Sequence, residues 1–210
     1  MPISRRTLLL LPVLVGPLAA CSQNRVSKDS TMSNKSALVV VDAQVGVLGP
    51  LWESQRVVSN LERLVKKARA AGSLVVWVQH SDDELKFGSD PWKLAPNFVP
   101  TPNEVVVHKK HNSSFAKTDL DQTLKSRNIG RIVLAGAATN WCIRATAYAA
   151  VDRGYDLTLV GDAHSTESMS FRDGRVVTAE SIVTDLNVVF KWLNAPDVKT
   201  EVVDTAAVVL

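Results

Sequence analysis

The chain has 210 residues, with 24 Lys and Arg against 21 Asp and Glu, which gives a formal net charge of +3. Hydrophobic residues make up 46% and charged residues 21%, ordinary globular proportions that exclude a disordered, collagen-like or coiled-coil chain. The small charge argues against nucleic-acid binding, and two cysteines are too few for a disulfide framework.

The first residues have the pattern of an export signal. Arg5 and Arg6 precede an apolar run that begins at Leu8 and is too short to span a membrane as a helix. Ser-Arg-Arg resembles a twin-arginine signal, and Leu-Ala-Ala-Cys at 18–21 resembles the lipobox of bacterial lipoproteins, in which Cys21 is acylated. We therefore predict a signal peptide over residues 1–20, with a buried N-terminal helix as the alternative.

A polar segment without aromatic residues follows at 21–36 and predicts a flexible tether. Together, these features predict a protein exported to the bacterial cell envelope and anchored on its periplasmic side by a lipid on Cys21. Met32 is an alternative start that would give a cytoplasmic form. Residues 37–210 then form one folded domain.

Strand-like and helix-like segments alternate from residue 37 onward. Apolar runs predict strands at 37–41, 74–78, 104–108, 131–135, 157–160 and 201–203. Helical spacing of apolar residues and stop signals predict helices at 57–68, 119–127, 141–153 and 176–190. This order predicts an α/β fold with a doubly wound, Rossmann-like, mostly parallel sheet of about six strands flanked by helices.

Reactive side chains end three of the predicted strands or follow them. Asp42 ends the first strand, Lys109 ends the third, and Cys142 follows the fourth at the start of a helix. Ligands bind beyond the carboxyl ends of strands in such sheets, so these side chains should converge. A thiol with an ordinary pKa of ~8.5 becomes a nucleophile when a helix N-terminus and a cation stabilise its thiolate, and a carboxylate can accept its proton.

Each residue also has a structural interpretation. Asp42 could cap a turn, Lys109 could be a solvated strand end beside Lys110, and Cys142 could be a small buried apolar residue. Their shared position at one edge of the sheet favours a thiol hydrolase.

The segments that carry these residues resemble the isochorismatase-like cysteine hydrolase superfamily, which includes nicotinamidases, carbamoylases and isochorismatase itself. The matching pieces are ALVVVDAQ, VVVHKKHNSSFAKTDLDQTL and LAGAATNWCIRATAYAAVDRGYDLTLVGDAHST. Their order and spacing fit over about three fifths of the chain, from residue 37 to about 166. The resemblance implies the same α/β fold, a hydrolase activity and a homodimer or homotetramer.

Residue by residue, the resemblance implies an Asp42–Lys109–Cys142 triad. Asp42 would act as general base and then as acid, and Lys109 would stabilise the charged carboxylate and thiolate. Lys110 is the competing assignment. Lys109 is preferred because it lies six residues before Phe115, as in the family pattern K-x-x-x-S-x-F.

The resemblance also implies an oxyanion hole. The segment 136–139, Gly-Ala-Ala-Thr, matches the family segment that contains a cis peptide, which here would join Ala137 to Ala138. The N–H groups of Ala138 and Cys142 would then bind the substrate oxygen during attack.

The region after the second strand departs from the nicotinamidases, which hold a metal through an Asp-x-His segment and a second histidine. Only His80 is present here, followed by Asp82, Asp83 and Glu84. A metal site usually has more than one strong ligand at workable spacing. We therefore predict no metal and no other cofactor, which argues against nicotinamide as the substrate.

Further residues are expected around the mouth of the site. We predict that Gln44 orients the base or a water molecule, that His80 lines the pocket and that His164 is a supporting hydrogen-bonding residue. The predicted contacts with the substrate also include four aromatic residues near loops, Trp52, Trp92, Phe115 and Trp141. Core or subunit-interface positions are the alternative for each of these four.

The function predicted from these residues is hydrolysis of the C–N bond of a small amide, carbamoyl or imide substrate through a Cys142 thioester. One alternative is vinyl ether hydrolysis of the isochorismatase type, which does not need the thiol. Another is a non-catalytic lipoprotein that binds a small ligand, for which an intact triad has no use. The expected partners are a small molecule and the membrane through the lipid anchor, with no nucleic acid.

Overall fold

A parallel sheet forms the centre of the computed structural model, which describes residues 35–210. Its strands are β1 (Lys35–Val41), β2 (Leu74–His80), β3 (Val105–Lys109), β4 (Ile129–Ala137), β5 (Asp156–Ser165) and β8 (Thr200–Val203). They lie in the order β3-β2-β1-β4-β5-β8, and every neighbouring pair is parallel. The predicted fold class is confirmed, whereas the predicted signal peptide, Cys21 and most of the predicted tether lie outside the described residues.

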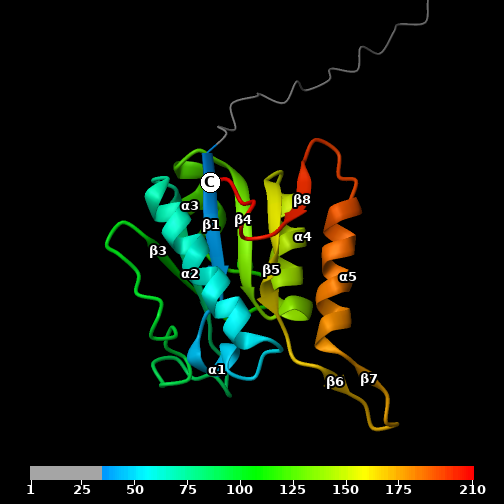
Figure 1. Ribbon diagram of the computed structural model, residues 1–210. Helices are drawn as coiled ribbons and strands as arrows, with labels where there is room; N and C mark the ends of the chain where they lie inside the picture. Colours follow the sequence, from blue (N-terminus) through cyan, green and yellow to red (C-terminus); the bar gives the residue numbers. More distant parts are fainter. Residues whose placement is uncertain (1–34) are drawn as a thin grey trace, which may run out of the picture. The chain divides into compact units, whose positions relative to one another are not determined.

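Helices cover both faces of this sheet (Figure 1). Helix α2 (Ser54–Ala70) packs on the face that carries Leu38 and Val40 of β1. The opposite face carries Val39 and Val41. Three helices cover it: α3 (Leu120–Ser126), α4 (Arg144–Asp152) and α5 (Ala179–Trp192). Both faces of β1 are therefore buried, which explains why the central strands read as continuous apolar runs.

Three features differ from the predicted elements. A short helix α1 (Val45–Leu48) follows β1, and an antiparallel pair, β6 (Met169–Ser170) and β7 (Val176–Val177), follows β5. The helix predicted from residue 176 begins only at Ala179, because Thr178 is its N-cap and accepts a hydrogen bond from the Ser181 N–H at 3.2 Å.

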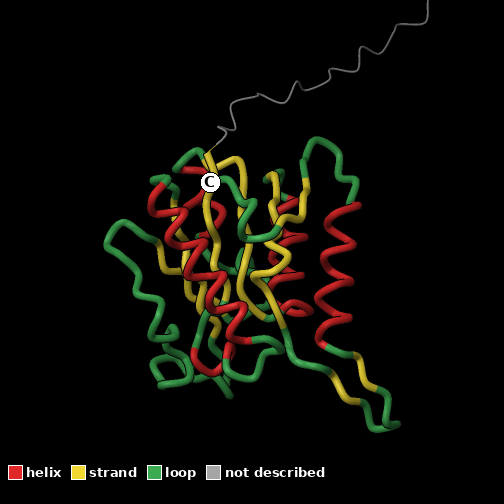
Figure 2. The backbone as a smooth tube through the Cα atoms, viewed as in Figure 1, coloured by secondary structure: helices red, strands yellow, loops and turns green. Residues whose placement is uncertain are grey.

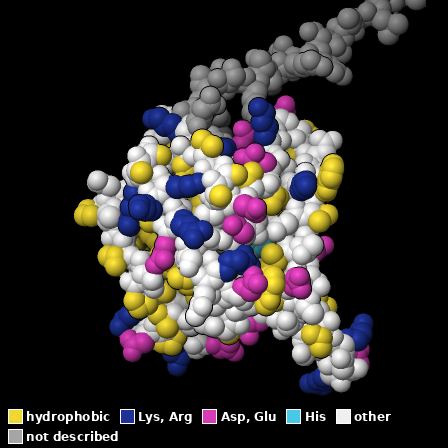
Figure 3. Space-filling view, viewed as in Figure 1, with side chains coloured by type: hydrophobic (Ala, Val, Ile, Leu, Met, Phe, Trp, Pro, Cys, Tyr) yellow, Lys and Arg dark blue, Asp and Glu magenta, His cyan; other side chains and the backbone are white. Residues whose placement is uncertain are grey.

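The carboxyl ends of all the parallel strands lie at the same end of the sheet, which is at the bottom of Figures 1 and 2. The β6–β7 hairpin projects from this carboxyl end of the sheet, and the long loop between β2 and β3 passes along it (Figure 2). On the face that carries α2, acidic and basic side chains are interspersed among apolar ones (Figure 3). Within residues 35–210, no helix combines the length and apolar character needed to cross a bilayer.

Candidate active site

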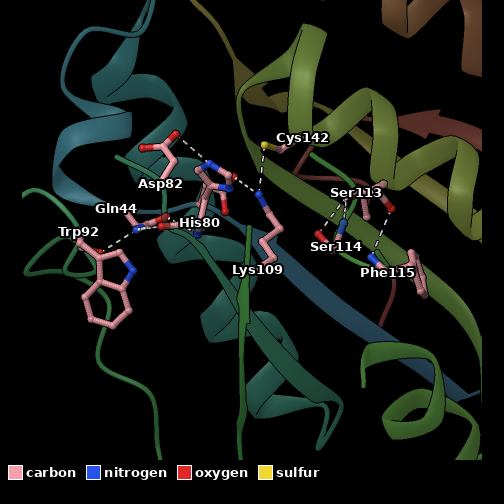
Figure 4. Close-up of polar contacts among 11 residues, drawn as sticks. Gln44, His80, Asp82, Trp92, Lys109, Ser113, Ser114, Phe115 and Cys142 are labelled. Carbon is pink, nitrogen blue, oxygen red and sulfur yellow. Dashed lines mark hydrogen bonds and ion pairs between the residues drawn. The ribbon is translucent and has the colours of Figure 1, made fainter. Parts of the chain in front are cut away.

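The side chains predicted at the strand ends come together in the structure (Figure 4). Lys109 Nζ lies 2.8 Å from Asp42 Oδ2 and 3.1 Å from Cys142 Sγ, so one ammonium contacts both the carboxylate and the sulfur. The Lys109 side chain is fully buried and Asp42 is almost so, while Cys142 is 8% exposed. Lys110 is exposed, so the structure places Lys109 and not Lys110 beside the thiol.

Close backbone packing at the ends of β1 and β4 brings these groups together. Asp42 has a left-handed backbone conformation with a φ of 50°, which is uncommon for a residue other than glycine. Beside it, Gly136 has a φ of 123°, and a Cβ there would lie 2.0 Å from the Val41 carbonyl oxygen. Only glycine fits this approach. The peptide bond between Ala137 and Ala138 that follows is cis, as the resemblance implied.

Burial changes the proton affinities of the acid and the thiol. Desolvation raises the pKa of Asp42, against the opposing effect of Lys109. Desolvation, followed by the charge of Asp42, raises the pKa of Cys142 to about 12. Burial thus opposes the stabilised thiolate that the sequence predicted, whereas the Lys109 cation favours it. The raised pKa values favour a proton on the sulfur and a more basic Asp42 carboxyl beside it.

A second buried network supports the segment that carries Cys142. This segment, η1 (Thr139–Ile143), is a π-helical turn that continues into α4. Thr139 Oγ1 lies 2.9 Å from Nδ1 of His164 in β5, and His164 Nε2 lies 2.9 Å from Oδ1 of Asn187 in α5. Burial lowers the pKa of His164 to about 4. His164 is thus a neutral hydrogen-bonding residue that joins three elements.

Gln44 does not take the predicted place in substrate binding. It is fully buried, and its Nε2 donates to the carbonyl oxygens of His80 and Trp92 at 2.9 and 2.7 Å. Its Oε1 accepts from the His80 N–H at 2.8 Å. Because these bonds use both amide N–H donors and the side chain is fully buried, Gln44 joins the turn after β1 to the end of β2 and to the β2–β3 loop, and presents no polar atom to a substrate.

Two of the aromatic residues expected in the substrate pocket pack elsewhere. Phe115 is buried in the core, with its ring stacked on Tyr155 at 6.0 Å between centroids. The Trp92 ring points away from Lys109 (Figure 4) and packs against Phe87 and His108 at 4.4 and 5.3 Å. Both predictions are corrected, because Phe115 is a buried core residue and the Trp92 ring packs against Phe87 and His108 instead.

A small cavity opens beside the Cys142 segment. It has a volume of about 240 Å³. The described residues that line it are Gly46, Val47, Leu51, Ala138, Asn140, Trp141, Thr166, Glu167 and Met169. Trp141, which directly precedes Cys142, is the one predicted aromatic residue among them and is 51% exposed. Trp52 is half-buried, and its ring lies under the Arg56 guanidinium at 5.4 Å.

His80 lies at the end of β2, and its imidazole Nε2 is 3.0 Å from Asp82 Oδ2. The sequence did not predict this contact between His80 and Asp82. Within residues 35–210, no group of three or more His, Cys, Asp or Glu side chains is arranged to hold a metal ion. That the protein works without a metal stays a prediction.

Comparison with known protein families identifies the domain. Residues 36–187 match the isochorismatase domain family, which covers most of the described chain. The chain belongs to the isochorismatase family. It is therefore a hydrolase with the α/β fold that the sequence predicted.

One sequence relative and two solved structures illustrate what the chain is similar to. A streptothricin hydrolase from Streptomyces noursei is 36% identical over 138 residues, which are 62% of this chain and 54% of that protein. The match thus spans about half the length of that relative. An isochorismatase from Pseudomonas putida superposes with a TM-score of 0.75 at 27% identity, over 86% of this chain and 92% of that one. An N-carbamoylsarcosine amidase from Thermoplasma acidophilum shares the fold, with a TM-score of 0.66 at 24% identity over 83% and 98% of the two chains.

Proposed function

We propose that this isochorismatase-family protein is a cofactor-free cysteine hydrolase that cleaves the C–N bond of a small amide, carbamoyl or imide compound. The observation that carries the proposal is the buried Lys109 ammonium in contact with both Asp42 and Cys142, at 2.8 and 3.1 Å. The cavity of about 240 Å³ beside Trp141 favours a small substrate group. The names of two relatives, a streptothricin hydrolase and an N-carbamoylsarcosine amidase, agree with this reaction class.

In the first half of the proposed reaction, Cys142 Sγ attacks the substrate carbonyl while its proton passes to Asp42. Burial supports this transfer because it raises the pKa of the Asp42 carboxyl and makes the carboxylate a stronger base. Lys109 pairs first with the carboxylate and then with the anion that develops on sulfur, until attack moves the negative charge to the substrate oxygen. The N–H groups of Ala138 and Cys142 would stabilise the negative oxygen of the tetrahedral intermediate.

The intermediate then collapses. Asp42 returns the proton to the departing nitrogen, the C–N bond breaks, and a neutral thioester forms on Cys142. Water hydrolyses this thioester to release a carboxylic acid and the free thiol. An arrangement of this kind serves no purpose in a protein that only binds its ligand.

The test is a panel of primary amides, N-carbamoyl compounds and cyclic imides, with released ammonia, amine or ring-opened acid as the readout. The Cys142→Ala variant should lose at least about a thousand-fold in rate on every compound that the wild type hydrolyses, because the nucleophile is gone. Cys21→Ser is the matched cysteine control and should retain full activity. Hydrolysis that continues in Cys142→Ala would exclude the thioester mechanism.

A further inference from the structure

His80 lies beside the triad on a neighbouring strand. It pairs in register with Lys109 of β3, and β1, which leads into Asp42, runs along the other side of β2. In Figure 4 the ring lies between the Asp82 carboxylate and the Lys109 side chain.

Asp82 sets the orientation and the tautomer of this ring. Its Oδ1 accepts the backbone N–H groups of Glu84 and Leu85 at 3.0 and 2.7 Å, which leaves Oδ2 for His80 Nε2 at 3.0 Å. The hydrogen bond from Leu85 is the main cause that lowers the pKa of Asp82, so this carboxylate is ionised. An ionised carboxylate only accepts, so Nε2 carries a hydrogen, and in the neutral form of the ring Nδ1 then presents a lone pair.

Two buried acceptors beside the triad are therefore left without an N–H or O–H donor. His80 Nδ1 and Asp42 Oδ1 are both buried, and no N–H or O–H group of residues 35–210 hydrogen-bonds to either, so once Cys142 is acylated its thiol is not a donor to Asp42 either. Buried polar atoms are nearly always paired in folded proteins, so such a pair beside a nucleophile indicates a position for a reactant with two donors. Water has two O–H donors, and it is the second substrate of any hydrolase.

We propose that His80 Nδ1 is the base that activates the hydrolytic water in the second half of the proposed reaction. The water oxygen attacks the thioester carbonyl carbon while one of its protons moves to Nδ1. The C–S bond then breaks and the carboxylic acid leaves. The proton on His80 passes to the Cys142 sulfur, which restores the thiol. This assignment rests on the proposed cysteine mechanism.

Counter-ions explain why Asp42 needs a second base beside it. During acylation, Asp42 can take the thiol proton because the thiolate that forms replaces the carboxylate as the counter-ion of Lys109. The thioester is neutral, so a proton on Asp42 at that stage would leave the fully buried Lys109 ammonium unpaired. His80 has its own counter-ion in Asp82, so its protonation leaves no buried charge without a partner.

The experiment follows turnover of p-nitrophenyl acetate by the full chain, with stopped-flow detection of p-nitrophenolate and intact-mass detection of the acetylated protein. Release of the phenolate reports acylation, and the steady-state rate reports deacylation. The variant His80→Gln retains an amide donor for Asp82 and removes the Nδ1 lone pair. Asp82→Asn and the exposed neighbour Asp83→Asn form a matched pair.

His80→Gln should acylate at the wild-type rate, accumulate one acetyl group on Cys142 and show a steady-state rate about a hundred-fold lower, the usual contribution of a general base. Asp82→Asn should also slow deacylation. Asp83→Asn should slow neither acylation nor deacylation. Hydroxylamine, a nucleophile that attacks thioesters without a base, should restore turnover in His80→Gln. If His80 had only a structural role, hydroxylamine would not restore turnover in His80→Gln.

The inference is overturned if His80→Gln slows acylation as much as deacylation, or changes neither. The proposed function fails separately. If Cys142→Ala still hydrolyses the ester at the wild-type rate and Cys142 is never acetylated, both the cysteine mechanism and the role of His80 are excluded. Melting temperatures of the variants identify any loss of activity that comes from unfolding.

Discussion

At the scale of single residues, the site is a buried carboxylate and a buried thiol that share one cation. Lys109 contacts both, and burial raises the pKa of each acidic group. Burial therefore favours a protonated thiol at rest, and in the proposed reaction the sulfur gives its proton to Asp42 during attack. A permanently formed thiolate would instead react with any electrophile that reached the site.

This arrangement predicts opposite effects of Asp42→Asn on two measurements. The charge of Asp42 raises the pKa of Cys142, so its removal should lower that pKa and speed alkylation of Cys142 by iodoacetamide at neutral pH. Amide hydrolysis should nevertheless fall by at least about a hundred-fold, because the general base is lost. Peptide-resolved mass spectrometry measures the alkylation, with Asp83→Asn as the control. Slower alkylation in Asp42→Asn would contradict the account.

At the scale of elements, buried hydrogen bonds hold the Cys142 segment against the sheet and a helix. His164 joins η1, β5 and α5 through Thr139 and Asn187. Asn187 Oδ1 accepts from His164 Nε2, because the other Asn187 atom, Nδ2, donates to the Gly161 carbonyl at 3.1 Å. Nδ1 of the neutral ring then accepts from the Thr139 hydroxyl.

His164 should make stability depend on pH. Its pKa falls from 6.5 to about 4 on burial, so between these values the unfolded chain binds the proton and the folded one does not. Its contribution is complete above pH 6.5 and is lost as the pH falls toward 4, in total on the order of 3 kcal/mol.

Urea unfolding at pH 7 and pH 4.5 measures this effect. The His164→Gln variant should lose less stability than the wild type between the two pH values. His111→Gln replaces an exposed histidine and should behave like the wild type. An equal loss in His164→Gln and the wild type would show that the buried imidazole does not carry the pH dependence.

The main elements could be predicted because parallel strands buried on both faces leave continuous apolar runs. The β6–β7 hairpin and α1 could not, since two to four residues give no periodicity. Strand ends predicted the positions of Asp42, Lys109 and Cys142. The bonds of Gln44 and Asp82 depend on the path of the β2–β3 loop, which no sequence pattern describes.

At the scale of the whole molecule, apolar side chains are exposed on the cavity rim and on the projecting hairpin. Trp141 is 51% exposed, Phe171 45% and Val176 55%. Such exposed apolar residues are common in contacts between subunits, which agrees with the homodimer or homotetramer that we propose. Light scattering on the purified protein measures the oligomeric state directly.

The export signal predicts a lipid on Cys21, which lies outside the described residues. In a bacterial host fed an alkyne-bearing fatty acid, the wild type should incorporate the label and fractionate with membranes. Cys21→Ser should remain unlabelled and soluble, because the acylated thiol is absent. Cys142→Ser keeps Cys21 and should be labelled like the wild type. Label in Cys21→Ser would exclude this anchor.

The most direct test of the account is acid-quench peptide mapping during turnover of the best amide found in the panel. An acyl group is expected on the peptide that contains Cys142. Its abundance should rise in His80→Gln, and it should be absent in Cys142→Ala, which should not turn over. Steady hydrolysis with no acylated Cys142 in either the wild type or His80→Gln would contradict the mechanism.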